Sequence, residues 1–137
     1  FLIINHPLSY RNILYLFDLK QANQKGIEYY DKIVDDLLSR NIDPFVTLNH
    51  WDIPQKFQDK GGWVERESIK YFLDYVDIIT NKLGDRVKNW ITHNEPWIIA
   101  YLGYNELYFS PLVYSQQLKQ VCLRQVKVFC MMVVLEK

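Results

Sequence analysis

The apolar side chains of the first well-patterned segment recur at helical spacing. They begin after Asn23, and charged residues occupy the opposite face. This periodicity predicts an amphipathic helix with Asn23 as its N-cap and an end near Arg40-Asn41. The predicted apolar face consists of Ile27, Tyr30, Ile33, Val34, Leu37 and Leu38.

A second helical pattern lies between two short apolar runs. It predicts a helix from about Glu65 to Leu83, with Gly84 in the C-cap position. The flanking runs, Ile42–Leu48 and Val87–Thr92, have the length and β-branched content of buried strands. The apolar stripe predicted for the helix contains Ile69, Phe72, Leu73, Val76, Ile79 and Leu83.

Each predicted strand ends in a cluster of polar and aromatic residues. The first is followed by Asn49-His50-Trp51-Asp52 and the second by Asn94-Glu95-Pro96. The order helix, strand, helix, strand predicts a parallel sheet with right-handed crossovers. Both clusters then lie at the same sheet edge, where sites of α/β proteins form, and we expect them to face one pocket. Proline restricts the preceding residue, so we expect extended backbone at Glu95.

The remaining segments carry weaker patterns. Phe1–Ile4 is compatible with a short strand, and Ile13–Phe17 is a further apolar run. Ile53–Trp63 contains Pro and Gly breakers and is expected to be a loop. Ile98–Tyr104 has the pattern of a starting helix, and Tyr114–Lys137 is compatible with a helix.

Composition restricts the classes of protein. The 137 residues suffice for one domain, and 49% of them are apolar, which argues against disorder. Sixteen basic residues balance sixteen acidic ones, so no net charge favours nucleic acid or an anionic membrane as a partner. No apolar run approaches the length needed to span a bilayer, and no phosphate-binding glycine loop is present. Oligomeric state stays open.

The cysteines and histidines give no metal or disulfide pattern. Cys122 and Cys130 are eight positions apart in a helix-compatible segment, too far for an undistorted disulfide. We take them as free thiols, which favours a cytoplasmic location and leaves secretion open. His6, His50 and His93 match no metal-ligand spacing.

Glu95 is the leading catalytic candidate. A carboxylic acid at a rigid strand end beside a low-dielectric pocket can protonate a leaving group. The alternative is a carboxylate that only caps the next helix. Asn94 can donate to a substrate hydroxyl or tie down its own turn. His50 can bind a polyol or serve the fold, and Asp52 is a second carboxylate for which a turn or salt bridge is the simpler role.

The four tryptophans divide into two pairs. Trp51 and Trp97 stand next to the predicted strand ends, where an indole face can stack on a sugar. Trp63 and Trp90 are predicted to be packing residues.

Three stretches of this sequence resemble glycoside hydrolase family 1, the β-glucosidase and β-galactosidase family of (β/α)₈ barrels. They are NQKGIEYYDKIVDDLL, IDPFVTLNHWDIPQKFQDKGGW and GDRVKNWITHNEPW, within residues 23–104. The resemblance implies an α/β fold that forms part of a TIM (β/α)₈ barrel, with two to three βα units. It makes residues 1–137 an incomplete barrel domain with a core at 23–104.

The resemblance also implies the chemistry. Glu95 corresponds to the general acid/base, Asn94 to the residue that holds the sugar 2-hydroxyl, and His50 and Trp51 to residues that bind the glycone. The implied reaction is retaining hydrolysis of a β-glycoside, with no cofactor and no metal. The preferred glycone and aglycone stay open.

The ends of the chain depart from the family pattern. The nucleophile motif T-E-N-G is absent from the 137 residues, and the chain does not begin with Met. We therefore expect a fragment of a longer glycosidase that carries the acid/base without the nucleophile and is inactive alone. A pseudoenzyme or carbohydrate-binding barrel, and a non-functional gene remnant, are the alternatives.

Overall fold

The structure is a computed structural model, and it describes residues 14–15 and 18–103. The predicted strand at Phe1–Ile4, the predicted helix at Tyr114–Lys137 and both cysteines lie outside these ranges. The described elements, in chain order, are β1 (Leu14–Tyr15), β2 (Asp18–Ala22), α2 (Gln24–Ser39), β3 (Phe45–Asn49), α3 (Gln55–Asp59), η1 (Gly62–Val64), α4 (Ser68–Leu83), β4 (Asn89–His93), α5 (Pro96–Ile98) and the π-helical turn η2 (Ile99–Gly103).

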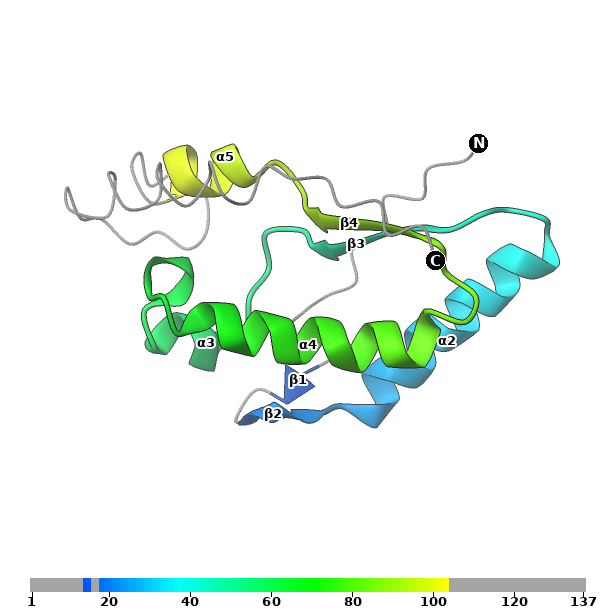
Figure 1. Cartoon of the computed structure of the whole chain (residues 1–137), viewed down its shortest axis with the longest axis horizontal. Coiled ribbons are helices and arrows are strands. Elements are labelled where there is room, and N and C mark those ends of the chain that lie inside the picture. The colour runs from blue at the N-terminus through cyan, green and yellow to red at the C-terminus, as the bar shows by residue number, and fades with distance from the viewer. Residues whose placement is uncertain (1–13, 16–17, 104–137) are drawn as a thin grey trace.

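The predicted parallel pairing is present. β3 and β4 run side by side in the same direction, with Phe45 opposite Asn89 and Asn49 opposite His93. Figure 1 shows this pair above α2 and α4, with α5 continuing from the end of β4. β1 and β2 form a separate antiparallel hairpin. The predicted order of helix, strand, helix and strand is therefore confirmed.

Both strands begin later than the apolar runs predict. Pro44 lacks an amide proton and cannot join a ladder as a donor, which is consistent with β3 starting at Phe45. The amide of Val87 donates instead to the Leu83 carbonyl at 2.8 Å, so β4 begins two residues further on, at Asn89.

Helix α2 agrees closely with its predicted pattern. Asn23 occupies the N-cap position and the helix ends at Ser39. Three members of the predicted apolar face are buried, and the other three are half-buried at its border. The buried residues are Ile27, Tyr30 and Val34.

The apolar stripe predicted for α4 is wrong at two positions. Ile69 and Leu73 are 38% and 57% exposed, whereas Tyr75 is fully buried. Leu73 stands about 100° of helical rotation from the buried Phe72, on the flank of the helix rather than its core face. The helix also starts at Ser68 instead of Glu65, because Glu65 has extended backbone as the C-cap of η1.

The segment predicted as a loop after β3 contains structure. Its Pro54 is the N-cap of the five-residue helix α3, and Gly62 opens the 3₁₀ turn η1. Phe57 and Trp63 from these two elements stack edge to face, with ring centroids 4.8 Å apart. The loop prediction missed this small aromatic layer.

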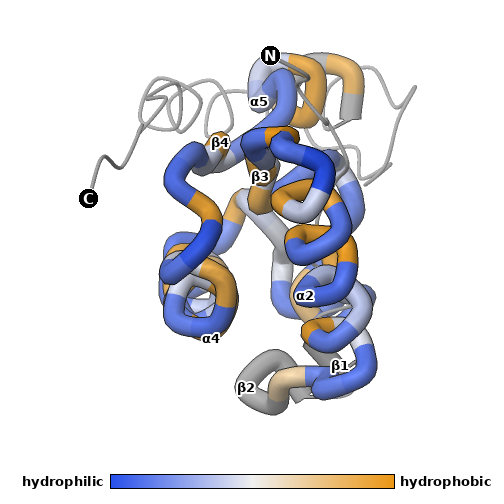
Figure 2. Tube along the Cα trace, turned by 90° about the vertical axis from the view of Figure 1, so that its right-hand side faces the viewer, coloured by the Kyte–Doolittle hydropathy of each residue, from blue (hydrophilic) through white to orange (hydrophobic). Residues whose placement is uncertain are grey.

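The core lies between the two strands and the two long helices. Figure 2 shows α2 and α4 next to each other on one side of the strand pair. Tyr75 pins α4 to β3, because its buried hydroxyl donates to the Leu48 carbonyl at 2.8 Å. Trp63 and Trp90 are 8% and 6% exposed, which confirms both as packing residues. No described helix has the length and apolarity needed to cross a membrane.

Arg86 joins α2 to the connection between α4 and β4. Its guanidinium donates to Asp31 of α2 at 2.5 Å and also to Asp35, and it pairs with its neighbour Asp85. The hydrogen bonds that Arg86 donates to Asp31 and Asp35 raise the pKa of Arg86. The hydrogen bond from Arg86 lowers the pKa of Asp31 from 3.8. The arginine side chain is 26% exposed, so this clamp is only partly screened by solvent.

We expect Arg86→Met to lower the free energy of unfolding by about 1–2 kcal/mol, because it breaks charge-assisted hydrogen bonds between distant segments. The loss should be present above the ordinary pKa of Asp31, 3.8, and should shrink as the pH falls through the lowered value. Urea unfolding measures it. Arg40→Met is the control, since Arg40 pairs with Asp36 within one exposed helix face and should cost under about 0.5 kcal/mol. Equal losses in the two variants would contradict the clamp.

Candidate active site

The parallel register brings the two strand exits into contact. The amide of Asn94 donates to the Asn49 carbonyl at 2.9 Å, which extends the pairing of β3 and β4 by one bond. The indole Nε1 of Trp51 donates to the Asn94 carbonyl at 3.1 Å, across 43 positions of sequence. The two polar clusters, which were predicted to lie at one edge of the sheet, are therefore joined by direct hydrogen bonds.

The backbone of Glu95 contradicts the sequence expectation. It was expected to be extended before Pro96, but it is left-handed, with φ 43° and ψ 59°. Pro96 is already the first residue of α5, and the amide of Ile98 donates to the Glu95 carbonyl at 2.9 Å. One residue must therefore turn the chain from strand into helix. A left-handed non-glycine residue costs about 1–2 kcal/mol.

The side chain of Glu95 is exposed at this turn. Glu95 occupies the N-cap position of α5, yet it makes no side-chain capping hydrogen bond. Its Oε2 accepts a hydrogen bond from Nδ2 of Asn94 at 3.3 Å. The capping role that was the alternative for Glu95 is thus not realised, and the two neighbouring polar side chains contact each other.

Asn49 is a buried residue beside the candidate site that the sequence reasoning passed over. It is fully buried at the end of β3, and its Nδ2 donates to the Asp52 carbonyl at 3.0 Å. This bond closes the turn that contains His50 and Trp51, whose rings lie 5.6 Å apart. Trp51 is also left-handed, with φ 74°. An amide that ends an otherwise apolar run was the available signal.

His50 and Asn49 each carry a buried polar side-chain atom that has no hydrogen-bond partner among the described residues. Within the part of the chain that the structure describes, Nδ1 of His50 and Oδ1 of Asn49 make no hydrogen bond. Both atoms belong to the turn after β3, next to Trp51. Unsatisfied buried polar atoms carry a cost in free energy, so a polar ligand that pairs with them gains by it.

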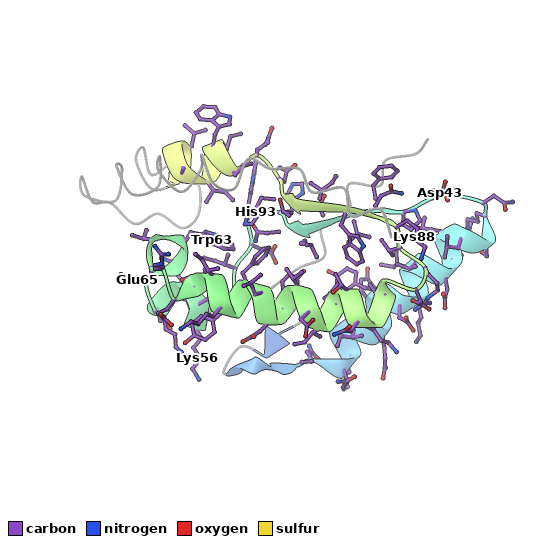
Figure 3. The ribbon with its side chains drawn as sticks, viewed as in Figure 1. Asp43, Lys56, Trp63, Glu65, Lys88 and His93 are labelled. Carbon is purple, nitrogen blue, oxygen red and sulfur yellow. The ribbon has the colours of Figure 1, made fainter. Side chains whose placement is uncertain are left out.

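His93 is the second residue that the sequence reasoning passed over. It ends β4, and its ring packs on Trp63 at 4.9 Å and on Phe72 at 4.8 Å between centroids. Burial lowers the pKa of His93 to about 4. Figure 3 shows His93 and Trp63 beneath the end of β4, above α4. The imidazole is therefore a neutral packing group at neutral pH, directly before Asn94 and Glu95.

Three further observations complete the description of the candidate site. Trp97 in α5 is 53% exposed, as a ring available for stacking requires. Across residues 14–15 and 18–103, no group of three or more His, Cys, Asp or Glu side chains is arranged to hold a metal ion. A pocket of about 480 Å³ near the start of α4 includes Lys60, whose Nζ donates to Tyr71 at 2.7 Å, but none of the predicted site residues line it.

Comparisons with known proteins agree on one family. The family model described as glycosyl hydrolase family 1 matches residues 8–128. β-Glucosidase A of Thermotoga maritima is 50% identical over 84 residues, which are 61% of this chain and 19% of that protein. Human lactase/phlorizin hydrolase is 44% identical over 97 residues, 71% of this chain and 5% of that protein. The chain thus spans about a fifth of the length of the bacterial relative.

Solved structures give the same answer for the fold. The family 1 β-glucosidase from Thermotoga maritima superposes with a TM-score of 0.81 and 38% identity, covering 93% of this chain and 30% of that one. The fold is therefore part of a (β/α)₈ barrel. The chain belongs to glycosyl hydrolase family 1.

The low pKa of His93 predicts acid sensitivity. Folded His93 takes up its proton only near pH 4, whereas the unfolded chain does so near 6.5. Between these values the unfolded state binds the extra proton, so the free energy of unfolding falls as the pH drops, by roughly 3 kcal/mol in total. We expect His93→Phe to remove this part of the slope in urea unfolding at a series of pH values. Identical slopes in both proteins would contradict the assignment.

The left-handed turn predicts that glycine is more stable than glutamine at position 95. Both substitutions remove the carboxylate, but only glycine adopts positive φ without a Cβ penalty. In urea unfolding, we expect the free energy of unfolding of Glu95→Gly to exceed that of Glu95→Gln by about 1 kcal/mol. Glu65 is the matched control, because its φ is −81°. There the glycine variant should be the less stable one, and the same order at both positions would contradict the strain.

Proposed function

We propose that this chain supplies the proton-transfer half of a retaining β-glycosidase site, with Glu95 as the general acid/base. In the first step Glu95 protonates the glycosidic oxygen as the aglycone leaves and a second carboxylate attacks the anomeric carbon. In the second step Glu95 deprotonates the water that releases the sugar from that carboxylate. The curated relatives include proteins named as β-glucosidases, which supports a β-linked glucosyl residue as the substrate.

The main support for this proposal is the position, exposure and backbone conformation of Glu95. Its exposed carboxylate stands at the end of β4 on a strained left-handed residue, and it makes no capping bond to the helix that follows. Strain of this kind persists where the surrounding structure enforces it, and it clusters at functional sites. A capping or surface glutamate would have no need of such a backbone.

The neighbouring side chains support binding of a polyol. Asn94 is hydrogen-bonded to Glu95, and we assign its amide to the hydroxyl next to the anomeric carbon. His50 offers a buried Nδ1 that bonds to no described residue. The indoles of Trp51 and Trp97 offer apolar faces to the C–H faces of a sugar. We assign these four residues to substrate binding and Glu95 to catalysis.

The second carboxylate of a retaining site lies about 5–5.5 Å from the first. The T-E-N-G motif that carries it in the family is absent from the 137 residues. We therefore propose that Glu95 acts together with a nucleophile that this sequence does not contain.

A chimera tests the role of Glu95. Residues 23–103 replace the homologous segment of β-glucosidase A from Thermotoga maritima, which supplies the rest of a barrel. We expect Glu95→Gln in this chimera to slow hydrolysis of alkyl β-glucosides by about 10²–10⁴, because they need a proton on the leaving group. The glycosylation step with 2,4-dinitrophenyl β-glucoside, whose leaving group needs no proton, should be nearly unchanged.

The controls separate the proposal from its competitors. The 137-residue chain alone should give no turnover and serves as the background. An equal loss with both substrates would remove Glu95 from the acid role. A chimera that binds glucoside in calorimetry but hydrolyses neither substrate would favour the carbohydrate-binding reading of the chain.

A further inference from the structure

Trp51 makes a contact that its expected role in sugar binding does not explain. Its indole N–H donates to the backbone carbonyl of Asn94 at 3.1 Å, and Asn94 directly precedes Glu95. An indole carries a single N–H and no acceptor. A sugar hydroxyl can therefore receive this hydrogen only by displacing the Asn94 carbonyl.

The contacted carbonyl controls the conformation of Glu95. The Asn94 carbonyl and the Glu95 amide belong to one planar peptide group. Rotation of that plane about the N–Cα bond of Glu95 is the angle φ, which is 43° here. Because the Cα–C bond of Glu95 leads into the helix α5, a bond that holds the plane relative to this helix also holds φ. The other angle, ψ, is fixed by the bond from the Ile98 amide to the Glu95 carbonyl at 2.9 Å.

Both local preferences at Glu95 oppose the observed turn. A residue with a Cβ avoids positive φ, and a residue before proline avoids helical regions in favour of extended backbone. The turn accordingly needs contacts from outside its own segment. Asn94 is held from β3 at both backbone groups, since its amide donates to Asn49 at 2.9 Å and its carbonyl accepts from Trp51.

Trp51 is itself held firmly enough to act as a support. Its half-buried ring packs against the hydrophobic core. The turn that carries it is closed by the bond from Asn49 Nδ2 to the Asp52 carbonyl at 3.0 Å. The end of β3 is thus a rigid base from which one side chain reaches the end of β4.

We propose that Trp51 is a positioning residue for Glu95: its indole N–H holds the Asn94–Glu95 peptide plane and thereby keeps the Glu95 carboxylate at its strained turn. The importance of this role for catalysis rests on the proposed function of Glu95. The claim that Trp51 holds the backbone conformation of Glu95 does not. The ring face of Trp51 is then left to stack on a bound sugar, while its N–H donates to the Asn94 carbonyl.

The test is an NMR measurement on the full 137-residue chain. Positive φ brings the amide and α protons of one residue close together, so Glu95 should give an intense intraresidue cross-peak in a nuclear Overhauser spectrum. In Trp51→Phe, which keeps an aromatic ring but lacks the N–H, we expect this peak to weaken about fourfold as Glu95 relaxes to extended backbone. A variant with 3-benzothienylalanine at position 51 replaces only the N–H by sulfur and serves if the phenylalanine variant unfolds.

Trp90→Phe is the matched control, because it removes a buried indole from β4 without touching the Asn94 carbonyl. It should lower stability and leave the Glu95 peak intense. A purely structural Trp51 would behave in the same way, so an intense Glu95 peak in folded Trp51→Phe overturns the proposal. Rapid hydrogen exchange of the Trp51 indole in the wild-type chain also overturns it and needs no variant. If the chimera shows no acid role for Glu95 while the peak weakens as expected, the proposed function fails and the positioning role stands.

Discussion

The parallel pairing of β3 with β4 is the constraint on which the rest of this structure depends. Parallel strands end at the same edge of a sheet, so the residues after β3 and those after β4 meet although they are more than forty positions apart. The long crossover that parallel strands require is α4, which Tyr75 anchors to β3. The ion pairs of Arg86 then tie α2 to the end of that crossover. Each of these contacts supports the register that aligns the two exits.

Much of this arrangement follows from the sequence alone. The periodicity after Asn23 predicts α2 with its cap, and two apolar runs predict the parallel strands. The helical periodicity of α4 did not predict which residues of its wide apolar stripe are buried and which are exposed. Leu73 and Tyr75 differ by two positions, and their burial depends on which side of α4 faces the strands. The segment after β3 was predicted to be a loop but contains a short helix, because Pro and Gly can open a helix as well as break one.

The position of the candidate site in the fold was predictable, and its local geometry was less so. His50, Trp51, Asn94 and Glu95 were named from their positions after predicted strands, and the hydrogen bond between Trp51 and Asn94 brings the two groups together. Asn49 and His93 were missed because a polar residue at the end of a strand gives no sign of whether it faces the core. Glu95 was predicted to be extended but is left-handed. The rule for residues before proline describes a local preference and does not include hydrogen bonds from a neighbouring strand.

The turn at Glu95 also separates what the backbone favours from what the side chain offers. A single base change converts either glutamate codon into a glycine codon, and glycine is the residue that fits a backbone with φ of 43° without strain. The residue that would stabilise this turn is therefore one mutation away, but it has no carboxylate. Stability and the proposed proton transfer thus make opposite demands on position 95.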